Sequence, residues 1–138
     1  MDSLQLALKN LPNGQAGAKD DTSRIIILSA LSEQCEVTDI MKYAEPCVQL
    51  CEKGLSYSKT PTSKTFYLKH LAITLNNIGY LTQQQGNISK ALEYFFKCLE
   101  IQEEIKDKTG IARSFNNIGS IYDNMGDISR ALEYYHSS

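Results

Sequence analysis

Apolar residues recur along most of the chain at spacings of three and four, the pattern that predicts amphipathic helices. The clearest stretch contains this pattern twice, because residues 72–98 and 112–138 are identical at 12 of 27 positions. Unrelated segments of ordinary composition would agree at about two positions. Similarity at a fixed period of 40 residues predicts stacked copies of one supersecondary unit. The chain is therefore expected to be a helical repeat protein.

Glycines recur at positions where two packed helices would need them. Gly79 and Gly119 lie inside the first predicted helix of each copy, where glycine costs about 1 kcal/mol relative to alanine. Their shared register indicates a close approach of the partner helix. Gly86 and Gly126 follow the same helices and suit the left-handed conformation that ends many helices. Each copy is therefore expected to be a helical hairpin.

The apolar pattern also predicts an N-terminal helix over residues 3–11, with Asp2 or Ser3 as its N-cap and Pro12-Asn13-Gly14 as its end. Residues 15–21 are expected to form an exposed loop. This helix should cover the open edge of the first hairpin; the alternative is a frayed linker. The later helices are expected to begin at Thr22 or Ser23 and at Thr38 or Asp39, to span residues 66–84, 88–106 and 111–124, and to begin again near Ile128.

Two places depart from the regular period. A worn first unit aligns with the second at a spacing of 47 residues, so it carries an insertion. Residues 56–65 are polar and turn-forming, and are expected to be the inserted loop. Pro46 would interrupt the second helix of the first unit, so we expect a kink there or a helix that starts late.

These elements predict two parts. Residues 1–21 are the N-terminal helix and loop, and residues 22–138 are the repeat domain, with units of about 22–56, 66–106 and 110–138. The last unit is expected to be truncated, because Ala131, Leu132 and Tyr135 lie on a helix too short to be finished. This predicts a fragment of a longer array or, alternatively, a C-terminal edge that pairs with a second copy in a homodimer.

The composition narrows the possible functions. The 138 residues fit one domain, and 42% hydrophobic residues suffice for a modest core. The net charge is −2 and the Lys and Arg residues are scattered, so nucleic-acid binding is not expected. No stretch of eighteen apolar residues is present, so this sequence predicts no membrane contact. No signal peptide is visible.

The four cysteines, Cys35, Cys47, Cys51 and Cys98, do not resemble a small disulfide scaffold. Their places in the helical pattern favour free thiols that act as small buried hydrophobic groups. Cys47 and Cys51 are one helical turn apart, as two metal ligands could be, but no His or further Cys follows at zinc spacing. We expect no metal and no cofactor. Free thiols favour a cytoplasmic compartment, with the periplasm as the alternative.

No sequence motif for catalysis is present, so the sequence predicts no enzyme and no catalytic residue. His70 and His136 each stand alone and are expected to be surface or groove residues. Asn87-Ile-Ser is formally a glycosylation sequon, but its place at a helix start favours an N-cap.

The recurring residues resemble the tetratricopeptide repeat, in which a large residue, Leu-Gly and Tyr are followed by Ala and Phe. The second unit has Leu75, Ile78, Gly79, Thr82, Ala91 and Phe95, and the third has Phe115, Ile118, Gly119, Tyr122, Ala131 and Tyr135. The period of 40 rather than 34, a leucine at the first position of one unit and the missing closing proline are departures. The longer period is similar to that of the long-period subgroup of this family. The resemblance implies an all-α, right-handed superhelix of about three hairpins.

Asn76-Asn77 and Asn116-Asn117 stand immediately before the Ile-Gly pair in the two units. These paired asparagines resemble the asparagine ladder of long-period members of the family, such as kinesin light chains. An amide donates and accepts at once, so it can bind the main chain of an extended peptide in a concave groove. The resemblance implies this role for Asn77 and Asn117, with Asn76 and Asn116 beside them. The flanking positions that would set specificity are Tyr80, Gln83, Gln84, Arg113, Ser120, Asp123 and Asn124. The alternative is that the asparagines satisfy neighbouring helix ends.

A basic clamp on a peptide carboxylate, the other groove chemistry of this family, needs Lys and Arg where this chain has asparagines, and only Arg113 could contribute. The repeats are also similar to the sensory arrays of bacterial signalling proteins, over residues 20–138. This implies a non-catalytic peptide-binding module in the sensory or scaffolding part of such a protein. The alternative is a structural or dimerisation array for an attached histidine kinase, nucleotide cyclase or DNA-binding domain.

Overall fold

The computed structural model describes residues 2–11 and 18–137, and these form an all-α structure without strands. Its seven α-helices are α1 (Ser3–Asn10), α2 (Ala18–Gln34), α3 (Ile40–Tyr57), α4 (Pro61–Gln84), α5 (Ile88–Glu104), α6 (Lys108–Asn124) and α7 (Ile128–Ser137). A short 3₁₀ turn, η1 (Val37–Asp39), precedes α3. The predicted fold class is confirmed. Within the described part, no helix combines the length and apolarity needed to cross a membrane.

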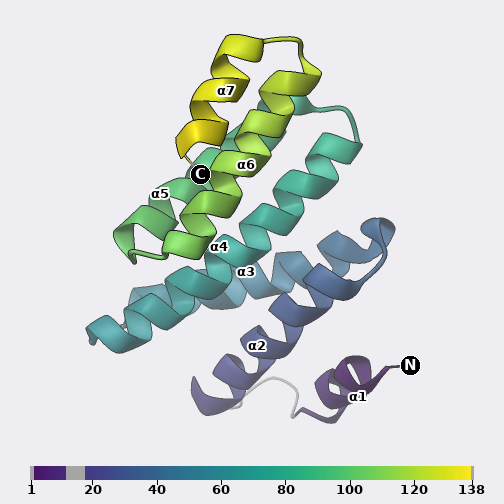
Figure 1. Cartoon of the computed structure of the whole chain (residues 1–138). Coiled ribbons are helices and arrows are strands. Elements are labelled where there is room, and N and C mark those ends of the chain that lie inside the picture. Colours follow the sequence, from purple (N-terminus) through teal and green to yellow (C-terminus); the bar gives the residue numbers. More distant parts are fainter. Residues whose placement is uncertain (1, 12–17, 138) are drawn as a thin grey trace.

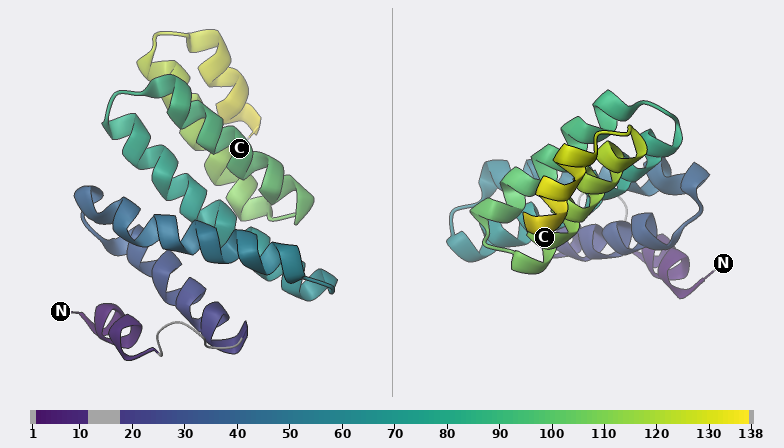
Figure 2. Two further views of the ribbon diagram at one scale, coloured as in Figure 1. Left: turned by 180° about the vertical axis from the view of Figure 1, so that it is seen from behind. Right: turned by 45° about the horizontal axis from the view of Figure 1, so that its top comes forward.

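The helices form three successive hairpins, α2–α3, α4–α5 and α6–α7, stacked from the N-terminus towards the C-terminus (Figure 1). The first helices of the hairpins, α2, α4 and α6, run side by side in one layer (Figure 1). Helices α3 and α5 lie on the opposite side, where the view from behind shows them in front (Figure 2). The stack therefore presents two faces built from different helices.

The turns explain the period of 40 residues. Gly86 and Gly126 have φ values of 84° and 80°, and Lys106 takes the same left-handed conformation with φ 58°. Each is followed by an Asn or Asp whose side chain accepts the backbone N–H three residues on, as an N-cap. The same three-residue turn thus recurs every 20 residues, because the helices between successive turns, α5 and α6, have 17 residues each. The predicted glycine ends and the Asn87 cap are confirmed.

Helix α4 contains the insertion that the sequence suggested would be a loop. It starts at Pro61 rather than near Phe66, and its 24 residues exceed the 17 of α5 and α6 by seven, the excess of the first repeat spacing. The Thr60 hydroxyl caps it by accepting from the Ser63 N–H, and Pro61 suits the first turn because it has no N–H to satisfy. The loop prediction for residues 56–65 is therefore wrong over residues 61–65, and also over residues 56–57, which belong to α3.

Other helix ends also differ from prediction. Helix α2 begins at Ala18, so the predicted loop is wrong over residues 18–21, which carry no apolar period; residues 12–17, with the predicted Pro12-Asn13-Gly14 end, lie outside the described residues. Helix α5 ends at Glu104 instead of Lys106, and α6 begins at Lys108 instead of Ile111, since Asp107 caps it. Helix α3 begins at Ile40 and contains Pro46, so the predicted late start is wrong.

Helix α1 covers the first hairpin, as expected. Asp2 and Gln5 form a reciprocal capping box at its start. Leu4 and Leu8 pack against the core, and the Gln5 side-chain nitrogen donates to the Tyr43 hydroxyl at 3.1 Å. The helix is thereby attached to α3 as well as to α2.

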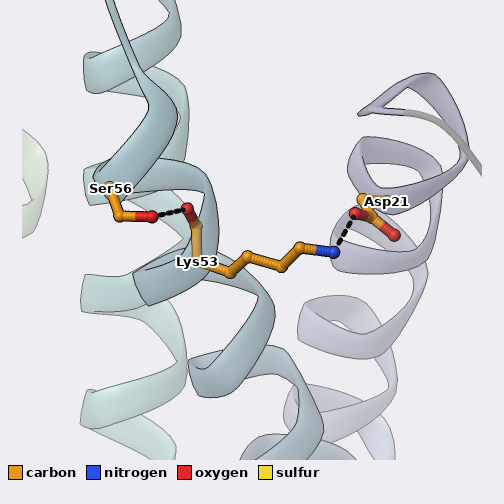
Figure 3. Close-up of polar contacts among 3 residues, drawn as sticks. All are labelled: Asp21, Lys53 and Ser56. Carbon is orange, nitrogen blue, oxygen red and sulfur yellow. Dashed lines mark hydrogen bonds and ion pairs between the residues drawn. The ribbon is translucent and has the colours of Figure 1, made fainter.

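An ion pair joins the start of α2 to the end of α3. The Lys53 Nζ lies 3.3 Å from the Asp21 carboxylate, and the Ser56 hydroxyl donates to the Lys53 carbonyl oxygen (Figure 3). Because the lysine side chain is 56% exposed, the pair contributes at most about 1 kcal/mol. Packing, rather than this contact, holds the first hairpin together.

Buried apolar residues form two clusters that meet on α5. Cys98 and Ile101 of α5 belong to the cluster with α2, α3 and α4, whereas Phe95 and Leu99 belong to the cluster with α6 and α7. The thiols of Cys47, Cys51 and Cys98 are buried and free, which confirms their predicted packing role; Cys35 is only half-buried. Burial raises the pKa of the Cys98 thiol to about 12, so it is uncharged at neutral pH.

The two in-register glycines let each hairpin close. A Cβ on Gly79 would lie 2.9 Å from Phe95 Cε1, and one on Gly119 would lie 2.9 Å from two ring carbons of Tyr135. An aromatic ring of the second helix therefore rests on the backbone of the first in both hairpins. The predicted close approach is confirmed.

Replacing Gly79 by alanine is expected to destabilise the protein. Phe95 is buried, and a Cβ on Gly79 would lie 2.9 Å from its ring. Overpacking costs about 1–3 kcal/mol, which exceeds the roughly 1 kcal/mol that alanine gains in a helix. Urea unfolding should show a loss for Gly79→Ala and a smaller loss for Gly119→Ala, because Tyr135 is half-exposed. A Phe95→Leu background should abolish the loss; a Gly79→Ala protein as stable as wild type would contradict the contact.

Replacing Lys106 by glycine is expected to stabilise the protein. A left-handed φ costs an L-residue about 1–2 kcal/mol, and glycine avoids this cost, although it adds entropy to the unfolded chain. The free energy of unfolding should rise by roughly 1 kcal/mol, as measured by urea denaturation. Lys106→Ala, the matched control, should give no gain. Equal stability of the glycine and alanine variants would contradict the assigned conformation.

Candidate functional site

The first helices of the second and third hairpins carry matching stripes of exposed and half-buried side chains. On α4 the stripe repeats at spacings of four and three from Lys69 through Asn76 to Gln83, and on α6 it repeats 40 residues later. We call these two stripes the amide face. It contains Lys69, Ile73, Asn76, Asn77, Tyr80, Gln83 and Gln84 on α4, and Thr109, Arg113, Asn116, Asn117, Ser120, Asp123 and Asn124 on α6. All eleven residues predicted from the sequence therefore lie on it.

The asparagines bond to side chains of neighbouring first helices. Asn117 Nδ2 donates to Asn76 Oδ1 at 2.9 Å, which joins α6 to α4. Asn77 Nδ2 donates to Ser32 Oγ at 2.8 Å, which joins α4 to α2. Asn76 lies within α4, whereas Ser32 lies in the last turn of α2. The amides thus form a row across the layer of first helices, with one side-chain hydrogen bond from α6 to α4 and a separate one from α4 to α2.

The row keeps hydrogen-bonding capacity for a further group. Among the described contacts, Asn76 Nδ2 and the Oδ1 atoms of Asn77 and Asn117 have no partner. Asn116 is exposed and makes no described side-chain hydrogen bond. Since an amide nitrogen donates and an amide oxygen accepts, the row offers both kinds of group along one line.

A cleft of about 260 Å³ opens beside Asn76. It is lined by Glu33 of α2, Lys69, Ala72, Ile73 and Asn76 of α4, Gln102 of α5, Asp107, and Thr109, Gly110 and Arg113 of α6. Two cations and two carboxylates therefore face the same space. Asp107 uses Oδ1 to accept the Gly110 N–H at 3.0 Å, and Gln102 accepts the buried Ser114 hydroxyl. Both groups are therefore held in place by contacts with α6.

The structure brings only part of the predicted site together. Asn76 and Arg113 line the cleft. The other nine predicted residues do not: Asn77, Tyr80, Gln83, Gln84, Asn116, Asn117, Ser120, Asp123 and Asn124. Sequence reasoning missed Lys69, Ile73 and Thr109, although continuing the stripe towards the helix starts would have found them. Gln102 and Glu33 carry no such signal, because they reach the cleft from other helices.

His70 links α2 to α4 next to the cleft. Its Nδ1 lies 3.0 Å from the Ser29 hydroxyl, which is also 3.1 Å from the Ile26 carbonyl. When that hydroxyl donates to the carbonyl, His70 Nδ1 is the donor to Ser29. Burial, with the neighbouring Lys69 charge, lowers the pKa of His70 from its usual value. The lowered pKa, rather than this contact, favours the neutral imidazole at neutral pH.

The chemistry of the site is that of binding. Within the described ranges, no group of three or more His, Cys, Asp or Glu side chains could hold a metal ion. The groups that face the amide face and its cleft are amides, hydroxyls and separated charges, which form hydrogen bonds and ionic contacts. Such groups can hold a polar chain without reacting with it.

Comparison with known proteins identifies the repeated unit. Residues 70–138 match the family model described as the tetratricopeptide repeat. The match covers half of the chain, namely the last fifteen residues of α4 and everything after them. No curated protein matches the chain. The match begins at residue 70, so it leaves out the worn first hairpin and the lengthened start of α4.

Acidification is expected to destabilise the α2–α4 contact through His70. Above the ordinary pKa of 6.5, the imidazole is neutral in both states, so there is no penalty. Below it the unfolded chain takes up the proton first, because the pKa of His70 is lower in the folded protein. Thermal unfolding measured from about pH 7 to about pH 5 should show a falling midpoint. His70→Gln should flatten this dependence; an unchanged slope would contradict the assignment.

Proposed function

The chain belongs to the tetratricopeptide repeat family, whose repeats generally mediate protein–protein interactions, and we propose that it binds an extended peptide of a partner protein along the amide face. The observation that carries this proposal is a pair of side-chain hydrogen bonds between neighbouring first helices. Asn77 bonds to Ser32, and Asn117 bonds to Asn76. Hydrogen bonds between neighbours fix the amides in place. Little side-chain entropy is then left to lose when a peptide binds.

The free atoms of the row match a peptide backbone. Asn76 Nδ2 can donate to a peptide carbonyl, and the oxygens of Asn77 and Asn117 can accept peptide N–H groups. These contacts do not depend on the peptide's sequence. The flanking charges of Lys69, Arg113 and Glu33 would then select side chains of opposite sign. The mixed charges favour a peptide that carries both acidic and basic residues.

The finer role that we propose is that of the sensory or scaffolding part of a bacterial signal-transduction protein. It is supported by the resemblance of the Asn-Asn-Ile-Gly units to sensory arrays. The hydrogen-bonding groups of the amide face support a module that binds a partner. A full-length gene with no signalling output domain would contradict this role.

A structural or dimerisation array is the second candidate. One observation favours it: Met125, Ile128 and Leu132 at the C-terminal edge are 58%, 53% and 51% exposed. Such a group of apolar side chains suits burial in a homodimer or against an attached domain. The two candidates involve different surfaces, so variants of the amide face separate them.

Two substitutions test the amide face with a peptide selected from a library of extended sequences. Asn76→Asp keeps the oxygen that accepts from Asn117 and removes the free donor, and Asn116→Ala removes an exposed amide. Each lost hydrogen bond should weaken binding by about three- to tenfold, as measured by fluorescence anisotropy. Glu93→Ala, on an exposed position of α5, is the matched control.

Circular dichroism melts establish that both variants remain folded. If both then bind the peptide as tightly as wild type, peptide binding along the amide face is wrong. If the chain also sediments as a dimer, the structural array becomes the better account.

A further inference from the structure

The two junctions between successive hairpins differ on the face formed by α3 and α5. Ala44 and Cys51 of α3 correspond to Ala91 and Cys98 of α5, and all four are fully buried. This alignment places Met41, Glu45 and Gln49 of α3 at the positions of Ile88, Leu92 and Phe96 of α5. The two helices therefore meet the following hairpin with side chains of different polarity.

At the second junction, apolar side chains close the contact. Ile88 and Leu92 pack against the cluster formed with α6 and α7. The Phe96 ring lies 6.2 Å from the ring of Tyr134 on α7, and Tyr134 stacks on Tyr122 at 5.5 Å. At the first junction the corresponding Glu45 and Gln49 are polar, so they supply no such apolar or ring contact, whereas Phe96 makes its ring contact with 38% of its surface still exposed.

A groove remains at the first junction. Two adjoining hollows of about 340 and 410 Å³ share Met41 of α3, Ile78 of α4 and Tyr94 of α5. Tyr94 corresponds in the repeat to Tyr134, yet it lines the groove instead of stacking on another ring. We call this space the inter-hairpin groove. From Met41 to Glu52 it follows α3 for about 16 Å, roughly three helical turns.

The two sides of the groove carry opposite charges. Glu45 and Glu52 line it from α3, and Lys90 and Lys97 line it from α5. All four are exposed, and none belongs to an ion pair between described residues. Apolar Leu75, Ile78 and Val48 lie between the charged sides. The groove thus has an apolar floor, an acidic edge and a basic edge.

We infer that the inter-hairpin groove binds an amphipathic helix of a partner protein, whose apolar side chains are spaced at three and four residues. The partner's side chains would supply the apolar contacts that Leu92 and Phe96 supply at the second junction. Basic residues on one edge of the partner helix face Glu45 and Glu52, and acidic residues on the other edge face Lys90 and Lys97. Helix-in-groove recognition of this kind uses anchors on one helix face, and complementary charges fix the orientation.

This surface is separate from the amide face. The charged edges of the groove belong to α3 and α5, which lie on the side opposite to the layer of α2, α4 and α6 (Figures 1 and 2). The inference therefore does not rest on peptide binding by the asparagines. One chain could hold two partners at once.

A phage library of amphipathic helices about four turns long, with varied edge charges, tests the inference on the full chain. Selected helices should carry one basic and one acidic edge. Glu45→Lys/Glu52→Lys should weaken their binding at least tenfold, and helices with two acidic edges should bind that variant better than wild type. Glu100→Lys/Glu103→Lys, on exposed positions of α5 outside the groove, is the matched charge control and should bind as wild type does.

A second variant copies the closed junction. Glu45→Leu/Gln49→Phe should fold, as followed by circular dichroism, and lose binding of the selected helices, whereas Asn116→Ala should retain it. Failure to select any helix, or binding that survives both groove variants, overturns the inference. Sedimentation as a dimer that Glu45→Lys/Glu52→Lys disrupts also overturns it, since a second copy would then be the occupant.

Discussion

The structure depends on contact between an aromatic ring and a bare helix backbone. Phe95 rests on Gly79 and Tyr135 rests on Gly119, so the second and third hairpins close to a distance that no larger residue permits. This distance keeps α4 and α6 in one layer with α5 behind them. The amide face exists because the first helices are neighbours, and the asparagines of one reach the polar groups of the next. The close packing of the ring thus offsets the helix stability that is lost by placing glycine inside a helix.

The repeated sequence predicts the residues that pack in the same way in both units, and it predicts little about the other positions. The 12 identical positions contain the glycines, alanines and asparagines that define the hairpin, so the second and third units could be predicted closely. The start of α4 could not be predicted, because the first residues of that helix are polar and resemble a loop. Thr60, its N-cap, and Pro61, its first residue, mark this start only once the helix is known. An apolar period arises from residues that are buried on one face of a helix, so the exposed end of a helix shows no such period.

The residues of the candidate site likewise divide into those that lie on the repeat and those that do not. Asn76 and Arg113 were predicted because they lie on a repeated stripe, and the structure places both at the cleft. Gln102 and Glu33 come from helices with their own register, so only the three-dimensional arrangement brings them there. The groove between α3 and α5 arises where the repeat is broken: Glu45 and Gln49 stand in place of Leu92 and Phe96. Departures from an otherwise consistent pattern are expected where a protein serves its partners rather than its own stability.

The seven extra residues of α4 are close to two whole turns of an α-helix. An insertion of that length extends the helix without rotating it, so every later side chain keeps its azimuth about the axis. Three or four more residues would keep it nearly as well, whereas two or five would swing Asn76 and Asn77 around the helix by roughly half a turn. The chain could therefore gain length at this point only in whole turns if its amides were to go on facing their neighbours.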